Sequence, residues 1–179
     1  MIELHGTVKE RFDEAIRLSS TKICEKELDY FRYLYDKAQI PLLPSAEEFY
    51  KKYGGVFRHH YLVLSDPTFN REIFFTFYTD YAVKPKGSEK KALTFMEDAM
   101  ENYGVVKEFA KQDVCPVADI GYYYPPVVYV GENGLLYCVF EYQEEIEVYH
   151  TPSEIFAEQL KNNIPIGIEI KSNQIKNDT

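Results

Sequence analysis

Residues 125–149 carry the sequence PPVVYVGENGLLYCVFEYQEEIEVY, which is the clearest strand region of the chain. Two runs rich in valine, leucine and aromatic residues flank Asn133-Gly134, and an Asn-Gly pair is the strongest short signal for a β-hairpin. A type I′ turn at this pair places Val130 opposite Tyr137. Both faces of the hairpin are then apolar, so we expect either that helices cover it on both faces or that one face binds a partner.

Helix signals lie on both sides of this hairpin. The S/T-x-x-E spacing of a capping box occurs at Thr7–Glu10, Ser45–Glu48 and Thr151–Glu154. We predict that helices begin there and that the first continues to Ala38, unless Ser19-Ser20-Thr21 divides it into two. Ser88 is placed to cap a further helix that ends near Tyr103.

The order of the elements predicts an α+β fold, a mainly antiparallel β-sheet with helices packed against it. Period-two patterns at 56–65 and 71–78 predict strands between the helices. The chain has 179 residues, which is the size of one domain. We predict a single domain over residues 1–165, with an extra N-terminal helix within 1–20, and a C-terminal tail at 166–179.

Negative charge is concentrated in the last third of the chain. Lys and Arg number 20 and Asp and Glu 29, which gives a net charge of -9. Residues 117–165 contain one base and eight acids and therefore contribute -7 of that charge. This balance disfavours direct binding of nucleic acid and fits a basic partner. We expect the acids to gather in one outward patch.

Two segments are candidates for binding a protein. The three adjacent residues Tyr122, Tyr123 and Tyr124 cannot all point inward, and exposed aromatic side chains are frequent hot spots of protein interfaces. The acidic candidates are Glu141, Tyr142, Glu144, Glu145 and Glu147. The alternatives are core packing for the tyrosines and, for the glutamates, a solvated sheet edge whose like charges discourage aggregation.

Signals for catalysis or metal binding are weak. His59 and His60 are adjacent and would point to opposite faces of a strand, so they do not form a metal site together. Cys24, Cys115 and Cys138 are widely spaced, without a Cys-x-x-Cys pair. We predict no catalytic residue, no cofactor and no metal. The start of the chain lacks the pattern of a signal peptide and the sequence has no stretch of about 20 apolar residues, so we expect a cytoplasmic protein without a membrane partner.

The order and spacing of several motifs resemble the SUKH superfamily, most closely its third subfamily. The motifs are Pro44 to Phe49, Lys52 to Val56, Cys115 to Ala118, Val130 to Tyr137 and Thr151 to Ala157. The resemblance covers about residues 21–162.

This resemblance implies an α+β fold and a role as an immunity protein that binds and neutralises a cognate bacterial toxin, often a nuclease. The family has no shared catalytic residues. A nuclease toxin must be basic to hold its substrate, so an acidic antidote matches it in charge. The alternatives are a regulatory or scaffold protein-binding module of the same superfamily and, third, a small hydrolase that uses Cys115 with a histidine.

Overall fold

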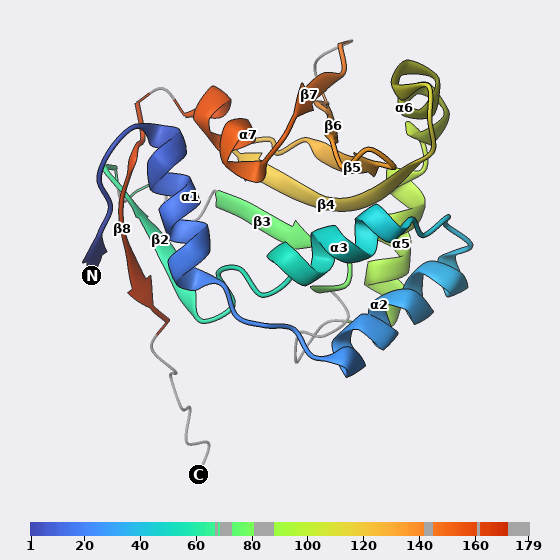
Figure 1. Ribbon diagram of the computed structural model, residues 1–179, viewed down its shortest axis with the longest axis horizontal. Coiled ribbons are helices and arrows are strands. Elements are labelled where there is room, and N and C mark those ends of the chain that lie inside the picture. Colours follow the sequence, from blue (N-terminus) through green and yellow to red (C-terminus); the bar gives the residue numbers. More distant parts are fainter. Residues whose placement is uncertain (67, 69–72, 81–87, 142–144, 161, 172–179) are drawn as a thin grey trace.

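The computed structural model describes residues 1–66, 68, 73–80, 88–141, 145–160 and 162–171, and these form an α+β fold with two antiparallel sheets (Figure 1). The helices are α1 (Val8–Ser19), α2 (Glu25–Ala38), α3 (Pro44–Tyr53), α5 (Glu89–Ala99), α6 (Tyr103–Ala110) and α7 (Pro152–Gln159). The strands are β1 (Ile2–Glu3), β2 (His60–Leu64), β3 (Ile73–Phe77), β4 (Val114–Tyr122), β5 (Val127–Gly131), β6 (Leu136–Val139), β7 (Glu147–Tyr149) and β8 (Pro165–Ile170).

The larger sheet has five strands in the order β3-β4-β5-β6-β7. Helices α3 and α7 pack on one face, where Val128, Leu136 and Cys138 join the main core. Helix α6 packs on the other face, where Tyr129 and Tyr137 are buried in a smaller cluster. Helices thus cover both apolar faces of the hairpin near its turn. This confirms the first of the two expectations from the sequence.

The turn of the hairpin differs from the sequence prediction. Val130 pairs with Leu136, not with Tyr137, and in the turn only Gly134 has a positive φ, of 77°. The Gly134 backbone N–H donates to the Gly131 carbonyl at 2.9 Å, and the Asn133 side chain accepts from the Leu135 N–H at 3.0 Å. These bonds indicate a type I turn followed by a left-handed glycine, a loop one residue longer than type I′.

Strand β4 was missed by the sequence analysis although it lies inside the sheet. Pro116 and Gly121 interrupt its pattern, and both residue types normally argue against an interior strand. The pairing of β4 with β5 shifts between Pro116 and Ala118, which is a β-bulge that accommodates the proline. The Pro116 carbonyl accepts a hydrogen bond from the buried Tyr35 hydroxyl, so this carbonyl is not left unsatisfied.

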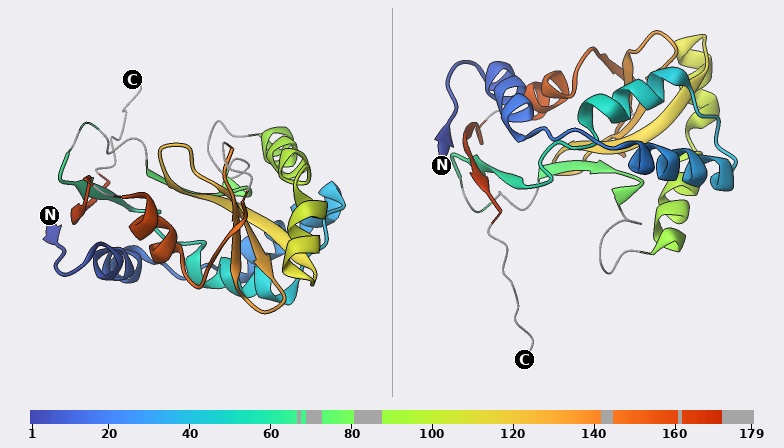
Figure 2. Two further views of the ribbon diagram at one scale, coloured as in Figure 1. Left: turned by 90° about the horizontal axis from the view of Figure 1, so that it is seen from above. Right: turned by 60° about the horizontal axis from the view of Figure 1, so that its bottom comes forward.

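The smaller sheet has the order β1-β8-β2 and corrects the prediction of a tail at 166–179. Residues 165–170 form its middle strand, with Ile168 fully buried between β1 and β2. The alternation of the sequence PIGIEI is too short for the strand to be distinguished from a loop without its partners. Residues 172–179 lie outside the described part of the chain. Figure 2 shows this sheet beside α1.

The helix starts that the capping boxes predict are confirmed in part. Thr7 and Glu10 make the complete capping box of α1, and the first helical segment is divided after Ser19 as the sequence allowed. The Ser45 box is wrong, because α3 already begins at Pro44 and Ser45 lies inside its first turn. At α7 the capping box does not form, although the helix begins after Thr151 as predicted: the Thr151 hydroxyl has no partner among the described residues, and Glu154 accepts from the backbone N–H of His150 and not from that of Thr151.

Strand β2 is shorter than the predicted strand at 56–65. Phe57 has a φ of 54°, and this left-handed residue prevents an extended backbone before His60. Within the described residues, no helix combines the length and the apolar composition that crossing a bilayer requires.

Candidate functional site

The topology of the five-stranded sheet brings the two candidate segments to the same end. Strand β4 ends at Tyr122, and β5 begins at Val127 beside it. Strand β6 ends at Val139, opposite Val127, and β7 begins after the following connection at Glu147. We call residues 122–126, 140–141 and 145–147 the aromatic–acidic end. Tyr142 and Glu144, which the sequence also nominated, lie outside the described residues.

The three tyrosines divide as the sequence analysis required. Tyr122 is half-buried, and its hydroxyl accepts a hydrogen bond from the Asn163 side chain at 3.0 Å. Tyr123 and Tyr124 are 52% and 54% exposed. Their rings meet edge to face with centroids 4.7 Å apart, which is a favourable geometry for an aromatic pair. Tyr122 is therefore structural, and more than half of each of the other two side chains is exposed at the surface.

The backbone that presents these rings is held in an uncommon conformation. Tyr123 and Tyr124 have φ values of 43° and 60°, in the left-handed region that bulky residues rarely adopt. Such a conformation costs roughly 1–3 kcal/mol per residue and persists only when its surroundings enforce it. The rigid Pro125-Pro126 pair follows directly, and the Tyr122 backbone N–H is fixed by the Gln159 side chain. Strain of this kind is concentrated at functional sites.

The acidic segment contains both free and engaged carboxylates. Glu141 and Glu145 are exposed and form no ion pair within the described residues. Glu147 is half-buried on the edge strand β7 and accepts a hydrogen bond from the Tyr149 hydroxyl. Burial, followed by that hydrogen bond, raises the pKa of Tyr149. Glu147 therefore helps to hold β7, and Glu141 and Glu145 are better placed to meet a partner.

The expectation of one acidic patch is wrong for part of the segment 117–165. Glu132 lies in the β5–β6 turn, at the opposite end of the sheet, and its charge acts on Lys107 of α6. Asp119 lies within β4, and Glu154 is engaged at the start of α7. The separation of these acids could not be predicted from their closeness in the sequence. An antiparallel strand carries residues that are near in sequence to opposite ends of the sheet.

Two of the thiols are unsuited to nucleophilic chemistry. Cys115 and Cys138 are fully buried in the main core, and Cys24 is exposed at the start of α2. Burial raises the pKa of the Cys115 thiol to about 12 and also raises the pKa of Cys138. A thiol that stays protonated at neutral pH is a poor nucleophile.

The histidines do not assemble a metal centre in the part of the chain that is described. His59 precedes β2 and is exposed, while His60 is half-buried on β2 and its Nδ1 has no hydrogen-bond partner among the described residues. No group of three His, Cys, Asp or Glu side chains within that part could hold an ion.

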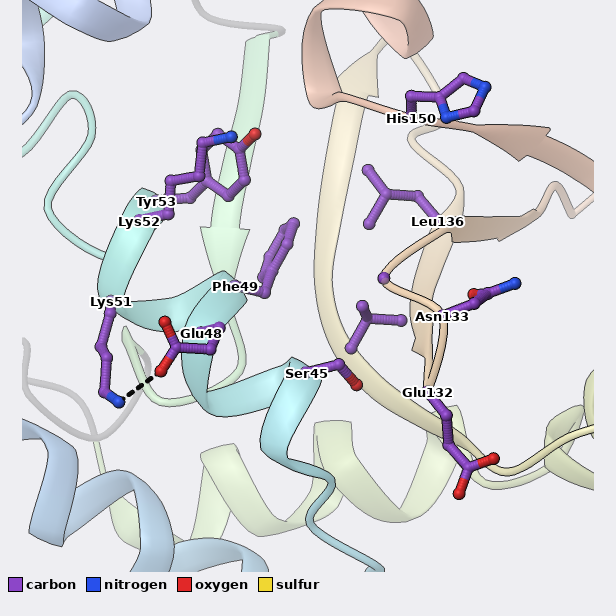
Figure 3. A pocket seen from close by; sticks show the side chains of 12 residues that line it. Ser45, Glu48, Phe49, Lys51, Lys52, Tyr53, Glu132, Asn133, Leu136 and His150 are labelled. Atoms are coloured by element: carbon purple, nitrogen blue, oxygen red, sulfur yellow. Dashed lines mark hydrogen bonds and ion pairs between the residues drawn. The ribbon is translucent and has the colours of Figure 1, made fainter.

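A groove of about 540 Å³ runs between α3 and the β5–β6 hairpin (Figure 3). Phe49 and Leu136 lie on opposite sides of its apolar floor. Lys51 is paired with Glu48 at 2.6 Å on the α3 side, and His150 stands at one end. The charges of its rim are mixed and partly paired, so the groove does not indicate one ligand class.

A second cleft of about 730 Å³ lies where β2 and β3, the neighbouring edges of the two sheets, meet the segment around Arg58. Arg58 pairs with Glu27 at 2.6 Å, and Lys171 donates to the Phe57 carbonyl at 2.7 Å. Arg58 and Lys171 are therefore already engaged in contacts within the protein. Neither hollow was predicted from the sequence, because each is formed by elements far apart in the chain.

Comparison of the chain with models of known protein families, with curated proteins and with solved structures finds no match in any of the three.

Proposed function

We propose that this protein is a non-enzymatic immunity protein that binds and neutralises a cognate, basic bacterial toxin through the aromatic–acidic end of its larger sheet. The proposal combines the SUKH-like order of motifs with one structural observation. That observation is the pair of exposed rings, Tyr123 and Tyr124, held by a strained and rigid loop at the end of the sheet that also carries Glu141 and Glu145.

The chemistry of this end suits a protein interface. Tyrosine is enriched at the energetic centre of interfaces because it buries a large ring and keeps a hydroxyl for hydrogen bonding. Since the loop is already fixed, little conformational entropy is lost when a partner binds. Exposed carboxylates at the same end of the sheet favour a basic partner and accelerate its approach. A nuclease toxin has such a basic surface because it must hold a polyanion.

The direct test is co-expression with the toxin encoded beside the gene of this protein. We expect the wild-type chain to restore growth and to co-purify with the toxin. Tyr123→Ala combined with Tyr124→Ala should weaken the complex about 30-fold or more, as the loss of two hot-spot side chains does. Tyr33→Ala is the matched control, since Tyr33 is also exposed, at 45%, but lies on α2. Absence of both rescue and binding by the wild type would refute the proposal.

The electrostatic part of the proposal has its own test. Glu141→Lys combined with Glu145→Lys should slow association about 10-fold at low salt and reduce the salt dependence of the association rate. Glu132→Lys changes the same kind of exposed residue at the opposite end of the sheet and should have a much smaller effect. The association rates are measured by stopped flow. If Glu132→Lys slows association as much as the double variant does, the interface lies elsewhere.

The regulatory alternative predicts the same surface and a different partner. A gene without a neighbouring toxin, together with binding of a cellular protein through the same tyrosines, would favour it. For the hydrolase alternative the buried state of Cys115 is unfavourable, because a nucleophile must be reached by its substrate and its base.

A further inference from the structure

Asp119 occupies an unusual position, in the interior of the five-stranded sheet. It pairs with Thr76 of β3 on one side and with Val127 of β5 on the other, and Val127 pairs in turn with Val139. Cross-strand partners share a face, so these four side chains form one row. The row lies on the face that α6 covers further along, where Tyr129 is fully buried. All four residues of the row are half-buried, and Val127 and Val139 pack against the fully covered cluster.

Asp119 also differs from the other half-buried carboxylates of the described residues, because it has neither a hydrogen bond nor an ion pair there. Those that meet a lysine or arginine are Glu14, Glu27, Glu47, Glu89 and Asp113. Those that accept from a hydroxyl or a backbone N–H are Asp66, Asp80, Glu147, Glu154 and Glu169. A buried carboxylate without a partner is costly, and each such case calls for an explanation.

The surroundings of Asp119 leave the carboxylate open to a ligand. Its oxygen atoms are still reached by solvent, although burial raises its pKa to about 6. At pH 7.5 the group is therefore ionised in a largely apolar setting. Val127 directly follows the loop that presents Tyr123 and Tyr124, so the row borders the aromatic–acidic end.

We infer that Asp119 is the anchor for a cationic side chain of the bound partner, an arginine in preference to a lysine. The alkyl stem of an arginine can lie on the apolar Val127 side chain, beside Asp119. Its guanidinium then lies over Asp119 and the neighbouring Thr76, so that its several N–H donors can reach the Asp119 carboxylate and the Thr76 hydroxyl. A desolvated charge pair of this kind is the type of contact on which interface affinity depends most. The inference extends the proposed function, since it names the group of the partner that the sheet face receives.

The first experiment does not require the toxin. The probe is Nα-acetyl-arginine amide, titrated into the full chain and followed by NMR of the backbone amides at pH 7.5. We expect saturable shifts centred on residues 76, 119 and 127, with a dissociation constant of roughly 1 mM, as befits so small a ligand. Nα-acetyl-citrulline amide, which has the same shape without the charge, should bind at least 10-fold more weakly, and Nα-acetyl-lysine amide should lie between the two.

The variant Asp119→Asn should abolish the saturable shifts. Glu132→Gln removes the same charge at the opposite end of the sheet and should leave them unchanged. Shifts that persist in Asp119→Asn, equal binding of the citrulline compound, or no saturable binding of the arginine compound would each overturn the inference. Asp119→Leu is the second variant, because leucine needs no polar partner. If the Asn variant does not fold, the same titration is made with the Leu variant, which should also show no saturable shifts.

The second experiment separates this inference from the proposed function. In the complex with the toxin, Asp119→Asn should raise the dissociation constant about 30-fold or more. Binding of the toxin with unchanged affinity would overturn the anchor and leave the immunity function standing. Binding of the arginine probe without any binding of a toxin would overturn the immunity function and leave the anchor standing.

Discussion

A single carboxylate illustrates how a residue can lower stability while it prepares a binding surface. Asp119 has a pKa raised to about 6 by burial, against 3.8 for a free aspartate. The stabilising contribution of the protonated group is fully present below pH 3.8 and is lost as the pH rises through 6. At neutral pH the folded protein therefore holds an ionised group that would be better solvated in the unfolded chain.

We predict that Asp119→Asn stabilises the free protein by about 1–3 kcal/mol at pH 7.5 and has little effect near pH 4. The rise of this pKa from 3.8 to about 6 sets the upper limit of the effect, and contact with solvent reduces it. Urea unfolding of both proteins across this pH range measures the difference. A variant that is less stable than the wild type at pH 7.5 would show that the carboxylate has a favourable partner.

The thiols give a second prediction at this scale. In the native protein at pH 8, only Cys24 should react with a thiol reagent within minutes, because Cys115 and Cys138 are buried and protonated. All three should react once the chain is unfolded in guanidinium chloride. Rapid native labelling of more than one thiol per chain would contradict the packing of these residues in the core.

Among the elements, the junction between α3 and β2 depends on one glycine. A Cβ atom at Gly55 would lie 1.8 Å from the Thr21 carbonyl oxygen, whereas one at Gly104 in α6 would meet nothing within 4 Å. Gly55 is thus required for the close approach of its segment to the end of α1. The glycine of α6 has no such role.

We therefore predict opposite effects for two identical substitutions. Gly55→Ala should destabilise the protein by about 2–4 kcal/mol, because the backbone must move apart. Gly104→Ala should stabilise it by about 0.5 kcal/mol, since alanine restricts the unfolded chain and favours helix. Thermal unfolding of the two variants gives the comparison, and equal effects would contradict this account of the junction.

The elements also show what the sequence could predict. The capping box at Thr7, the division of the first helix and the hairpin at residues 127–139 follow from local rules, and these predictions are confirmed. Strand β4 was missed because its bulge makes room for Pro116, and β8 because its partners β1 and β2 are distant in the chain. Such features are decided by tertiary contacts, which local patterns do not contain.

The same distinction holds for the candidate site. Exposure of at least one ring in Tyr122–Tyr124 followed from adjacency alone and is confirmed for two of the three. The dispersal of the acids to both ends of the sheet, and the isolation of Asp119 within it, depend on strand register. A one-residue error in the hairpin register, as in the sequence prediction, exchanges the two faces of a strand.

For the molecule as a whole, the small sheet ties both ends of the described chain together. Strand β8 lies between β1 and β2, and the Leu4 backbone N–H donates to the Ile166 carbonyl at 2.9 Å. Arg11 of α1 adds a hydrogen bond to the Pro165 carbonyl at 3.0 Å. Removal of β8 would leave β1 and β2 without a partner among the described strands.

We predict that a chain ending at Lys171 keeps the stability of the full sequence, because it retains all described strands. A chain ending at Asn163 should lose several kcal/mol of stability and most hydrogen-exchange protection in β2, where Leu62 and Leu64 are buried. Thermal unfolding and hydrogen exchange of both chains test this. Unchanged protection in the shorter chain would show that β2 is stable without β8.

The central place of β8 also has a consequence for biosynthesis. The ribosome makes β1 and β2 long before it reaches the strand that unites them, and the entire larger sheet is translated in between. During this interval the apolar side of β2 has no final neighbour, so the nascent chain is exposed to chaperones and proteases until translation passes Ile170. The slow step in maturation of this protein should therefore be the late closure of its smaller sheet, which pairs residues of high sequence separation.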